Sequence, residues 1–397
     1  MPCHKRKGLS QDLFEGLQNE TGKTIAPKRQ RFEAPNDDPN VGVGVDVDVD
    51  VDVDVMDVDV DNHLGRSIRC MILLSKATLP INVDDDAYEY DVLQKSPKEL
   101  HQELRRQITD AKEGLKQSEY KADIDEHIID ELARMVYGSN MIENVGGGLD
   151  ITLKLCKDVF RGGKEPPEEI SEHDPDYEQL DLYLYNKDLP CKHADILQSY
   201  REIVQHAKAA RFMIEQVCIN DKDLSEYIIT QAHGDLTYKI EISNRIPWNE
   251  YSGQYRLWNV QCSSHVFMDH SKVRMAMRDM IEELESDIRK ATDKGQIDPV
   301  ALASKYCHKF VNIHPFGDGN GRMCRLILNT LLIKYGGGFP IVSIGQDGRD
   351  RREYLRIAVA QSMKQLAFLT LQHACDSILR LEEATKLRES ILNDKKT

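Results

Sequence analysis

One stretch of the chain, from His314 to Arg325, reads HPFGDGNGRMCR and constrains the fold more than any other. Upstream of it, apolar residues recur at helical spacing after an N-cap pair, Asp298-Pro299. Pro315 disfavours helix for the residue before it, so we predict that this helix ends at His314. The glycines that follow permit a tight turn into a second helix, from about Arg322 to Tyr335.

The second helix is mostly apolar and is expected to be buried, with a polar face made by Arg322, Arg325 and Asn329. Buried cations need an anion nearby, and phosphates at the start of a helix are natural partners. Asp318 is placed to hold Mg²⁺ against such phosphates, because magnesium prefers carboxylate and phosphate oxygens. His314, at a helix end, is a candidate general base for an attacking hydroxyl.

Each of these residues also has a simpler structural interpretation. The histidine can cap a helix, Asp318 can stabilise a turn, and the arginines can pair with structural carboxylates. Two other ligand-binding loops are excluded by the pattern. An EF-hand fails because Arg322 stands at the next ligand position, and a Walker loop fails because no Gly-Lys-Ser/Thr follows. The combination of these groups in one short loop favours a site for a nucleotide triphosphate and a metal.

The composition bounds the class of protein. The net charge of the 397-residue chain is −15, and part of it comes from the aspartates of a Val-Asp repeat, so no basic surface for nucleic acid is expected. The N-terminus lacks the apolar core of a signal peptide, and no apolar run is long enough to span a membrane. Nine scattered cysteines without a CxxC pair favour reduced thiols. We therefore expect a soluble cytoplasmic or nuclear protein without a membrane partner.

Residues 1–64 are expected to form a disordered low-complexity tail, rich in charge, glycine and proline. The repeat from Val45 to Val60 alternates like a strand, but one face would carry only like charges. Two basic clusters in the tail, Lys5–Lys7 and Pro27–Arg31, are candidate nuclear-import signals. Residues 65–95 carry no clear pattern and stay unassigned.

Residues 96–220 are expected to form a helical region that begins at the N-cap pair Ser96-Pro97. A second helix there should bury one apolar face, made by Ile124, Ile128, Ile129, Leu132, Met135 and Val136. The acidic, proline-containing stretch of residues 162–188 is expected to be an exposed loop. Strand-like residues occur only near Tyr255–Val260 and His265–Phe267, and the Cys262-Ser263-Ser264 turn between them predicts a hairpin. The fold class is mainly α.

The segment from His314 to Arg325 resembles the signature of Fic (Fido-fold) enzymes, His-Pro-Phe-x-Asp/Glu-Gly-Asn-Gly-Arg-x-x-Arg, at every fixed position. The resemblance extends to Gly253–Arg256 and to the hairpin after it, which is similar to the flap that positions a target backbone by strand addition. It implies a Fic/Fido helical core over residues 221–385, followed by a C-terminal tail, residues 386–397. The target-binding flap residues would be Leu257, Val260, His265 and Phe267.

Fic enzymes usually transfer AMP from ATP to a protein hydroxyl and release pyrophosphate. By this resemblance, His314 deprotonates a Ser, Thr or Tyr of a protein substrate, and Asp318 binds Mg²⁺. The phosphates of ATP would be held by Gly319, Asn320 and Gly321. The resemblance also implies that Arg322 stabilises the transferring group and that Arg325 grips the γ-phosphate.

A second motif lies upstream, where Ser139, Glu143 and Asn144 match the autoinhibitory Ser/Thr-x-x-x-Glu-Gly/Asn pattern that precedes some Fic cores. The resemblance implies that Glu143 pairs with Arg325 and blocks the productive pose of ATP, as a carboxylate can neutralise an arginine that would otherwise meet phosphate. In related enzymes this glutamate also positions water to remove AMP.

The leading hypothesis is therefore an autoinhibited protein adenylyltransferase that binds ATP and a protein substrate. One alternative is a hydrolase that removes AMP with the help of Glu143, and another is transfer of a different nucleotide or phosphoryl-containing group. A catalytically silent binding module is disfavoured by the complete set of His, Asp, Asn and Arg residues. A homodimer stays open, because Fic proteins often dimerise.

Overall fold

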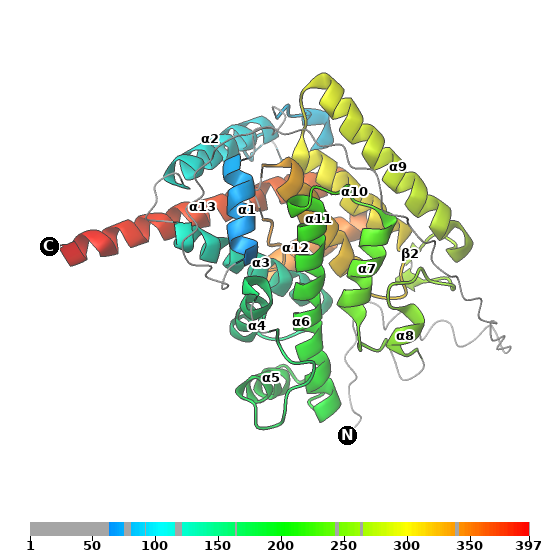
Figure 1. Ribbon diagram of the computed structural model, residues 1–397. Helices are drawn as coiled ribbons and strands as arrows, with labels where there is room; N and C mark the ends of the chain where they lie inside the picture. The colour runs from blue at the N-terminus through cyan, green and yellow to red at the C-terminus, as the bar shows by residue number, and fades with distance from the viewer. Residues whose placement is uncertain are drawn as a thin grey trace, which may run out of the picture.

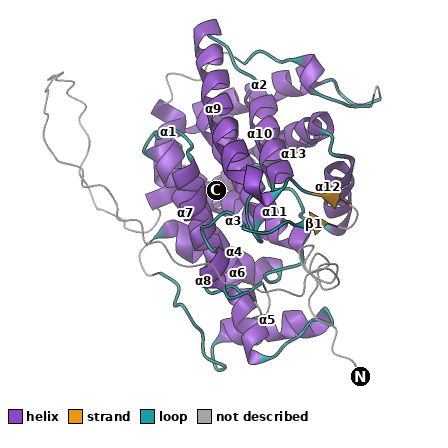
Figure 2. Ribbon diagram, turned by 90° about the vertical axis from the view of Figure 1, so that its right-hand side faces the viewer, coloured by secondary structure: helices purple, strands orange, loops and turns teal. Residues whose placement is uncertain are grey.

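The predicted mainly α fold is confirmed by the computed structural model. It describes residues 63–74, 81–91, 93–115, 121–162, 165–242, 246–262, 265–337 and 341–396 (Figures 1 and 2). The α-helices of the described residues are α1 (His63–Leu74), α2 (Pro97–Leu115), α3 (Lys121–Glu143), α4 (Leu149–Arg161), α5 (Pro175–Asn186), α6 (His193–Ile214), α7 (Glu226–Thr237), α8 (Trp248–Tyr251), α9 (His270–Lys294), α10 (Pro299–Ile313), α11 (Asn320–Tyr335), α12 (Gly348–Ala360) and α13 (Met363–Lys396).

Shorter elements complete the described chain. A 3-10 helix, η3, covers Asp85–Ala87, and a π-helix, η5, extends α6 over Glu215–Ile219. The strands β1 (Gln261–Cys262) and β2 (His265–Val266) pair antiparallel, with Gln261 opposite Val266. In Figure 2 these strands, in orange, lie beside α12.

The centre of the molecule is α11, which contacts α10, α3, α6 and α7 (Figure 1). This position follows from its sequence, because every side chain from Arg322 to Ile333 is buried and most of them are apolar. The predicted polar exceptions, Arg322, Arg325 and Asn329, are buried with the rest. Two guanidinium groups therefore lie in the core, where each needs a partner.

The helices around the glycine-rich loop begin and end close to the predicted positions. The carboxylate of Asp298 accepts a hydrogen bond from the Ala301 N–H, 2.9 Å away, and caps the start of α10. The helix ends at Ile313, and His314 takes a left-handed conformation with φ of 51°. Gly319, also left-handed with φ of 76°, precedes α11, which starts two residues before the predicted Arg322.

The predicted start of α2 and the predicted apolar face of α3 are both present. Ser96 and Glu99 form a reciprocal capping box, in which the Glu99 N–H donates to the Ser96 hydroxyl and the Ser96 N–H donates to the Glu99 carboxylate. The six apolar residues predicted for the next helix are all buried on α3. Because α3 continues to Glu143, it carries the Ser139–Asn144 motif up against the core.

Two sequence predictions are wrong. The expected loop at residues 162–188 contains α5, which buries Tyr177, Leu180 and Leu184 at helical spacing beneath an acidic surface. The strand expected at Tyr255–Val260 is instead β1, shifted to Gln261–Cys262, because the Arg256 N–H donates to the Pro315 carbonyl and not to a partner strand. Ser263 and Ser264 of the predicted turn lie outside the described residues.

The predicted domain boundaries stay predictions. Residues 1–62 lie outside the described residues, and α1 begins at His63, inside the range expected to be tail. At the other end, α13 continues to Lys396 through the expected C-terminal tail. A hydrophobic cluster reaches from Leu64 to Ile378, so the helical region and the core share apolar contacts, and their division at residue 221 stays a prediction.

None of the helices within the described ranges has the length and apolar character that crossing a membrane requires.

Candidate active site

His314 stands where α10 ends, and its ring is fixed from two sides. Its Nδ1 lies 3.1 Å from the Val311 carbonyl, and since a carbonyl only accepts, Nδ1 carries the hydrogen and Nε2 is the basic nitrogen. The ring also stacks on Phe267 of the flap, with centroids 3.7 Å apart. Burial lowers the pKa of His314 to about 4, so the imidazole is neutral near pH 7 and can accept a proton.

The loop after His314 is closed by the side chain of Asn320. Its Oδ1 accepts from the Phe316 N–H at 3.0 Å, and its Nδ2 donates to the Phe316 carbonyl at 2.9 Å. The resemblance assigned Asn320 to the phosphates, but its amide is occupied with the loop itself. Only the backbone N–H of Asn320 is therefore in position to serve an anion at the start of α11.

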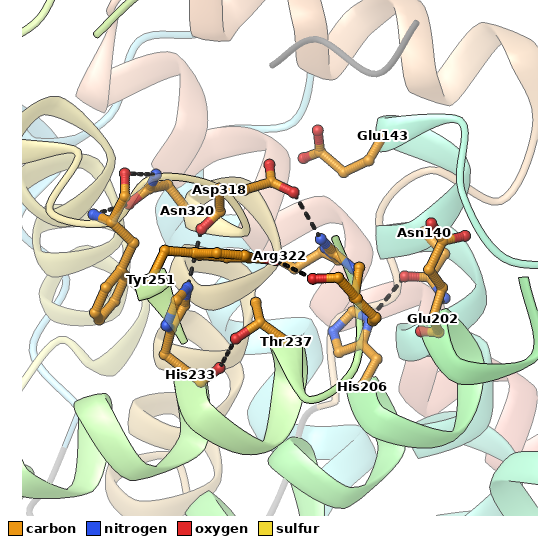
Figure 3. A network of polar contacts seen from close by, with 12 residues as sticks. Asn140, Glu143, Glu202, His206, His233, Thr237, Tyr251, Asp318, Asn320 and Arg322 are labelled. Atoms are coloured by element: carbon orange, nitrogen blue, oxygen red, sulfur yellow. Dashed lines mark hydrogen bonds and ion pairs between the residues drawn. The ribbon is translucent and has the colours of Figure 1, made fainter. Parts of the chain in front are cut away.

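A second histidine, His233 of α7, fixes the same loop and was missed by sequence reasoning. Its Nε2 donates to the Asp318 carbonyl at 3.0 Å (Figure 3). Its Nδ1 accepts from the Gly253 N–H at 3.0 Å. The ring stacks on Phe316, with centroids 3.6 Å apart and planes 5° from parallel. Burial lowers the pKa of His233 to about 4, so this bridge from the flap to the loop is neutral. No sequence motif joins these positions.

Arg322 is a buried cation with unused donors. Its side chain is 4% exposed, and the Asp318 carboxylate lies 3.6 Å from its Nη2 (Figure 3). Its Nε and Nη1 have no hydrogen-bond partner among the described residues. Buried donors without acceptors are costly, so the geometry favours a further anion here. Arg322 is the third residue of α11, and the first N–H groups of a helix lack partners inside it, so they can bind an anion.

Arg325, in contrast, is fully engaged by the protein. Its Nε donates to the Ser139 hydroxyl at 2.8 Å, and its Nη2 donates to the Ser139 carbonyl at 2.9 Å and to Glu143 Oε1 at 2.7 Å. Its Nη1 lies 3.3 Å from the Tyr354 hydroxyl. The ion pair expected between Glu143 and Arg325 is thus present, although the two residues are 182 positions apart.

Glu143 lies directly over the start of α11. A β-carbon placed on Gly321 would overlap the Glu143 carboxylate, so only glycine leaves room for it. The carboxylate is favoured there by the positive end of the helix. Asn144, the third residue of the upstream motif, is exposed and ends α3 in a left-handed conformation with φ of 55°. Glu143 therefore occupies space next to the N–H groups that could bind phosphate.

The flap is attached to the end of α10 by Arg256. Its Nε donates to the His314 carbonyl at 2.7 Å, and its Nη1 donates to the Trp258 carbonyl at 2.9 Å. Among the predicted flap residues, Leu257 and His265 are exposed, whereas Val260 is buried and its carbonyl accepts from the Phe267 N–H at 3.2 Å. The flap thus places a short strand edge beside the His314 imidazole.

The geometry defines a site with a neutral imidazole, a carboxylate and a buried guanidinium around a helix start. Residues 223–332 match the model of the Fic/DOC family. A Fido domain-containing protein of Dictyostelium discoideum is 36% identical over 106 residues, which cover 27% of this chain and 71% of that relative. The chain therefore belongs to the Fic/DOC family of Fido-domain proteins.

Other relatives share a smaller part of their length. A protein adenylyltransferase Fic of Nematostella vectensis is 36% identical over 126 residues, or 30% of this chain, and this match spans only 27% of that protein. The match to the protein adenylyltransferase Fic of Aedes aegypti is 46% identical and spans 12% of it. The Fic domain containing signaling protein of Bacteroides thetaiotaomicron has a TM-score of 0.49 at 18% identity, covering 74% of this chain and 98% of that one.

The low pKa of His314 predicts a specific pH dependence of stability. The unfolded chain should bind a proton at this residue below about pH 6.5, whereas the folded chain binds it only near pH 4. Between these pH values the unfolded state binds more protons at this residue than the folded state does, so the contribution of His314 to stability is lost as the pH falls. We expect the thermal midpoint to drop more between about pH 7 and pH 5 in the wild type than in His314→Asn. Parallel drops in the two proteins would contradict the low pKa.

Proposed function

We propose that this chain is an autoinhibited protein adenylyltransferase, which transfers AMP from ATP to a Ser, Thr or Tyr hydroxyl of a target protein. The observation that carries the proposal is the buried Arg322, whose Nε and Nη1 have no partner within the described ranges, at the start of α11 beside Asp318. A triphosphate supplies the oxygens that these donors need. Membership of the Fic/DOC family and relatives named protein adenylyltransferase support the same activity.

Different groups of the loop would bind the phosphates and the metal. The N–H groups of Gly321 and its neighbours and the Arg322 guanidinium would hold the phosphates, as helix starts do in other nucleotide sites. The Asp318 carboxylate, 22% exposed at its side chain, would hold Mg²⁺. When bound, Mg²⁺ neutralises charge on the phosphate oxygens. One carboxylate is sufficient, because magnesium usually keeps several waters beside the phosphates.

His314 would take the proton of the target hydroxyl on Nε2. The hydroxyl oxygen then bonds to the α-phosphorus of ATP, and the bond to the leaving pyrophosphate breaks. A base positioned in this way typically contributes about 10²–10⁴ in rate. The flap would hold the target backbone beside the imidazole through Leu257, Val260, His265 and Phe267. Phe267 would both hold the target and orient the imidazole, because it belongs to the flap and stacks on His314.

Autoinhibition would follow from competition between two anions for one guanidinium. In this structure the Nη2 of Arg325 donates to Glu143, so a γ-phosphate can reach Arg325 only when the Glu143 carboxylate moves away. The same carboxylate also fills the space over Gly321. The contacts that Arg325 makes with the Ser139 hydroxyl through Nε and with Tyr354 through Nη1 use other donors and can persist after Glu143 leaves.

Removal of Glu143 should therefore activate the protein. We expect Glu143→Gly to raise self-labelling by ATP tagged on the α-phosphate by at least about tenfold, because one hydrogen bond between charged groups is worth about 1.5–3 kcal/mol. The control is Glu143→Gly with His314→Ala, which should bind ATP and transfer nothing. Equal labelling by the wild type and Glu143→Gly would reject autoinhibition, and retained transfer in the double variant would remove His314 from the base role.

One observation favours removal of AMP as a second candidate activity. Arg325 bonds Oε1 of Glu143, the side chain is 20% exposed, and the second oxygen can therefore orient a water near the site. The test uses the Glu143→Gly protein after it has labelled itself and been freed of ATP. With wild-type protein added, the leading proposal predicts that the label persists. If the wild type removes the label faster than it adds label, the hydrolase is established instead.

The proposal also includes two features of the whole protein. The chain can form a homodimer, and it acts in the cytoplasm or the nucleus.

A further inference from the structure

The end of α3, which carries Glu143, is capped by a residue of α12. The Nε of Arg351 donates to the Met141 carbonyl at 3.0 Å and to the Ile142 carbonyl at 3.1 Å. These carbonyls belong to the last turn of α3, where backbone acceptors have no partner inside the helix. A cation at this end is also favoured by the helix dipole. Arg351 therefore holds the turn from which the Glu143 side chain extends.

The segment that leads into α12 makes close backbone contacts with α3. A β-carbon on Gly138 of α3 would overlap the Ile344 carbonyl, and one on Gly345 would overlap the Gly138 carbonyl. Beside them, the Gln346 side chain donates to the Arg134 carbonyl at 2.9 Å. Backbones that approach this closely leave little freedom to slide, so the chain is fixed against α3 a few residues before Arg351.

The same helix also contacts the other half of the inhibitory ion pair. Tyr354 follows Arg351 by three residues on α12, and its hydroxyl lies 3.3 Å from the Nη1 of Arg325. Arg351 thus positions the backbone beneath Glu143, while Tyr354 contacts the guanidinium that Glu143 binds. The helix α12 therefore contacts the backbone just before Glu143 and the guanidinium that Glu143 binds.

The rest of α3 is held independently of Arg351. Immediately before Met141, Asn140 donates from Nδ2 to the Glu202 carbonyl at 3.2 Å and accepts on Oδ1 from His206 at 2.8 Å (Figure 3). This network lies in the core and attaches α3 to α6. Loss of Arg351 should therefore loosen the carbonyl end of α3 at Met141 and Ile142 without detaching the helix.

We propose that Arg351 is a positioning residue, which keeps Glu143 in its blocking pose by capping the last turn of α3. The inference rests on the proposed function, because the glutamate that it positions is the proposed inhibitor. Weakening the cap shifts Glu143 toward poses that leave Arg325 free for a γ-phosphate. Anything that draws Arg351 away from α3 would then activate the protein while the catalytic loop stays unchanged.

The test compares Arg351→Met with Arg352→Met, which removes the same charge from an exposed neighbour. We expect Arg351→Met to raise self-labelling about threefold to tenfold, the size of a lost helix-end charge contact, and Arg352→Met to leave it unchanged. Arg351→Lys, which keeps the charge, should fall between them. In the Glu143→Gly background Arg351→Met should add nothing, since the residue that it positions is gone. Thermal midpoints of all variants check that they fold.

Hydrogen exchange separates this inference from the proposed function. Amides at residues 141–145 should exchange faster in Arg351→Met than in Arg352→Met, whether or not the protein transfers AMP. Faster exchange without labelling by Glu143→Gly would contradict the proposed AMP transfer but support the capping role of Arg351. Unchanged exchange, or an equal gain in labelling in the Glu143→Gly background, would overturn the role of Arg351.

Discussion

The structure depends on burying two guanidinium groups at the start of one central helix. Arg322 and Arg325 lie on the same face of α11 and are nearly inaccessible to solvent, so each needs compensation. Arg325 obtains it from Ser139, Glu143 and Tyr354. Arg322 obtains only one carboxylate at 3.6 Å and keeps two donors without a partner among the described residues. Arg325 is thus already paired with an anion, the Glu143 carboxylate, whereas Arg322 has donors left for a further one.

Rigid support around the loop explains how a short turn can hold these groups in place. Asn320 closes the loop on itself, His233 ties it to the flap, and Arg256 fixes the end of α10. His314 and His233 both have a lowered pKa and stay neutral near pH 7, so neither adds charge beside the arginines. A site held in this way has little reorganisation left to do when charge develops, which is the main source of electrostatic catalysis.

The sequence predicted the parts of the site that depend on local chemistry. The pattern around Pro315 predicted the end of α10, and the apolar run after Arg322 predicted a buried helix. Other features depend on contacts between distant segments, which no local pattern contains. Arg351 caps residues 209 and 210 positions earlier, and His233 reaches the Asp318 carbonyl from another helix. The helix α5 was missed because its acidic surface outweighed three buried apolar residues, and the first strand was misplaced because Arg256 binds the loop backbone.

The central claim is that the unpartnered donors of Arg322 belong to a triphosphate. It is tested most directly by titrating ATP with Mg²⁺ into Glu143→Gly and into the same protein with Arg322→Met, using calorimetry. Loss of a buried charge-assisted contact should weaken ATP binding by about tenfold or more, with a matched thermal midpoint as evidence of folding. Equal affinity in the two proteins would show that the buried guanidinium serves the fold alone and would contradict the account.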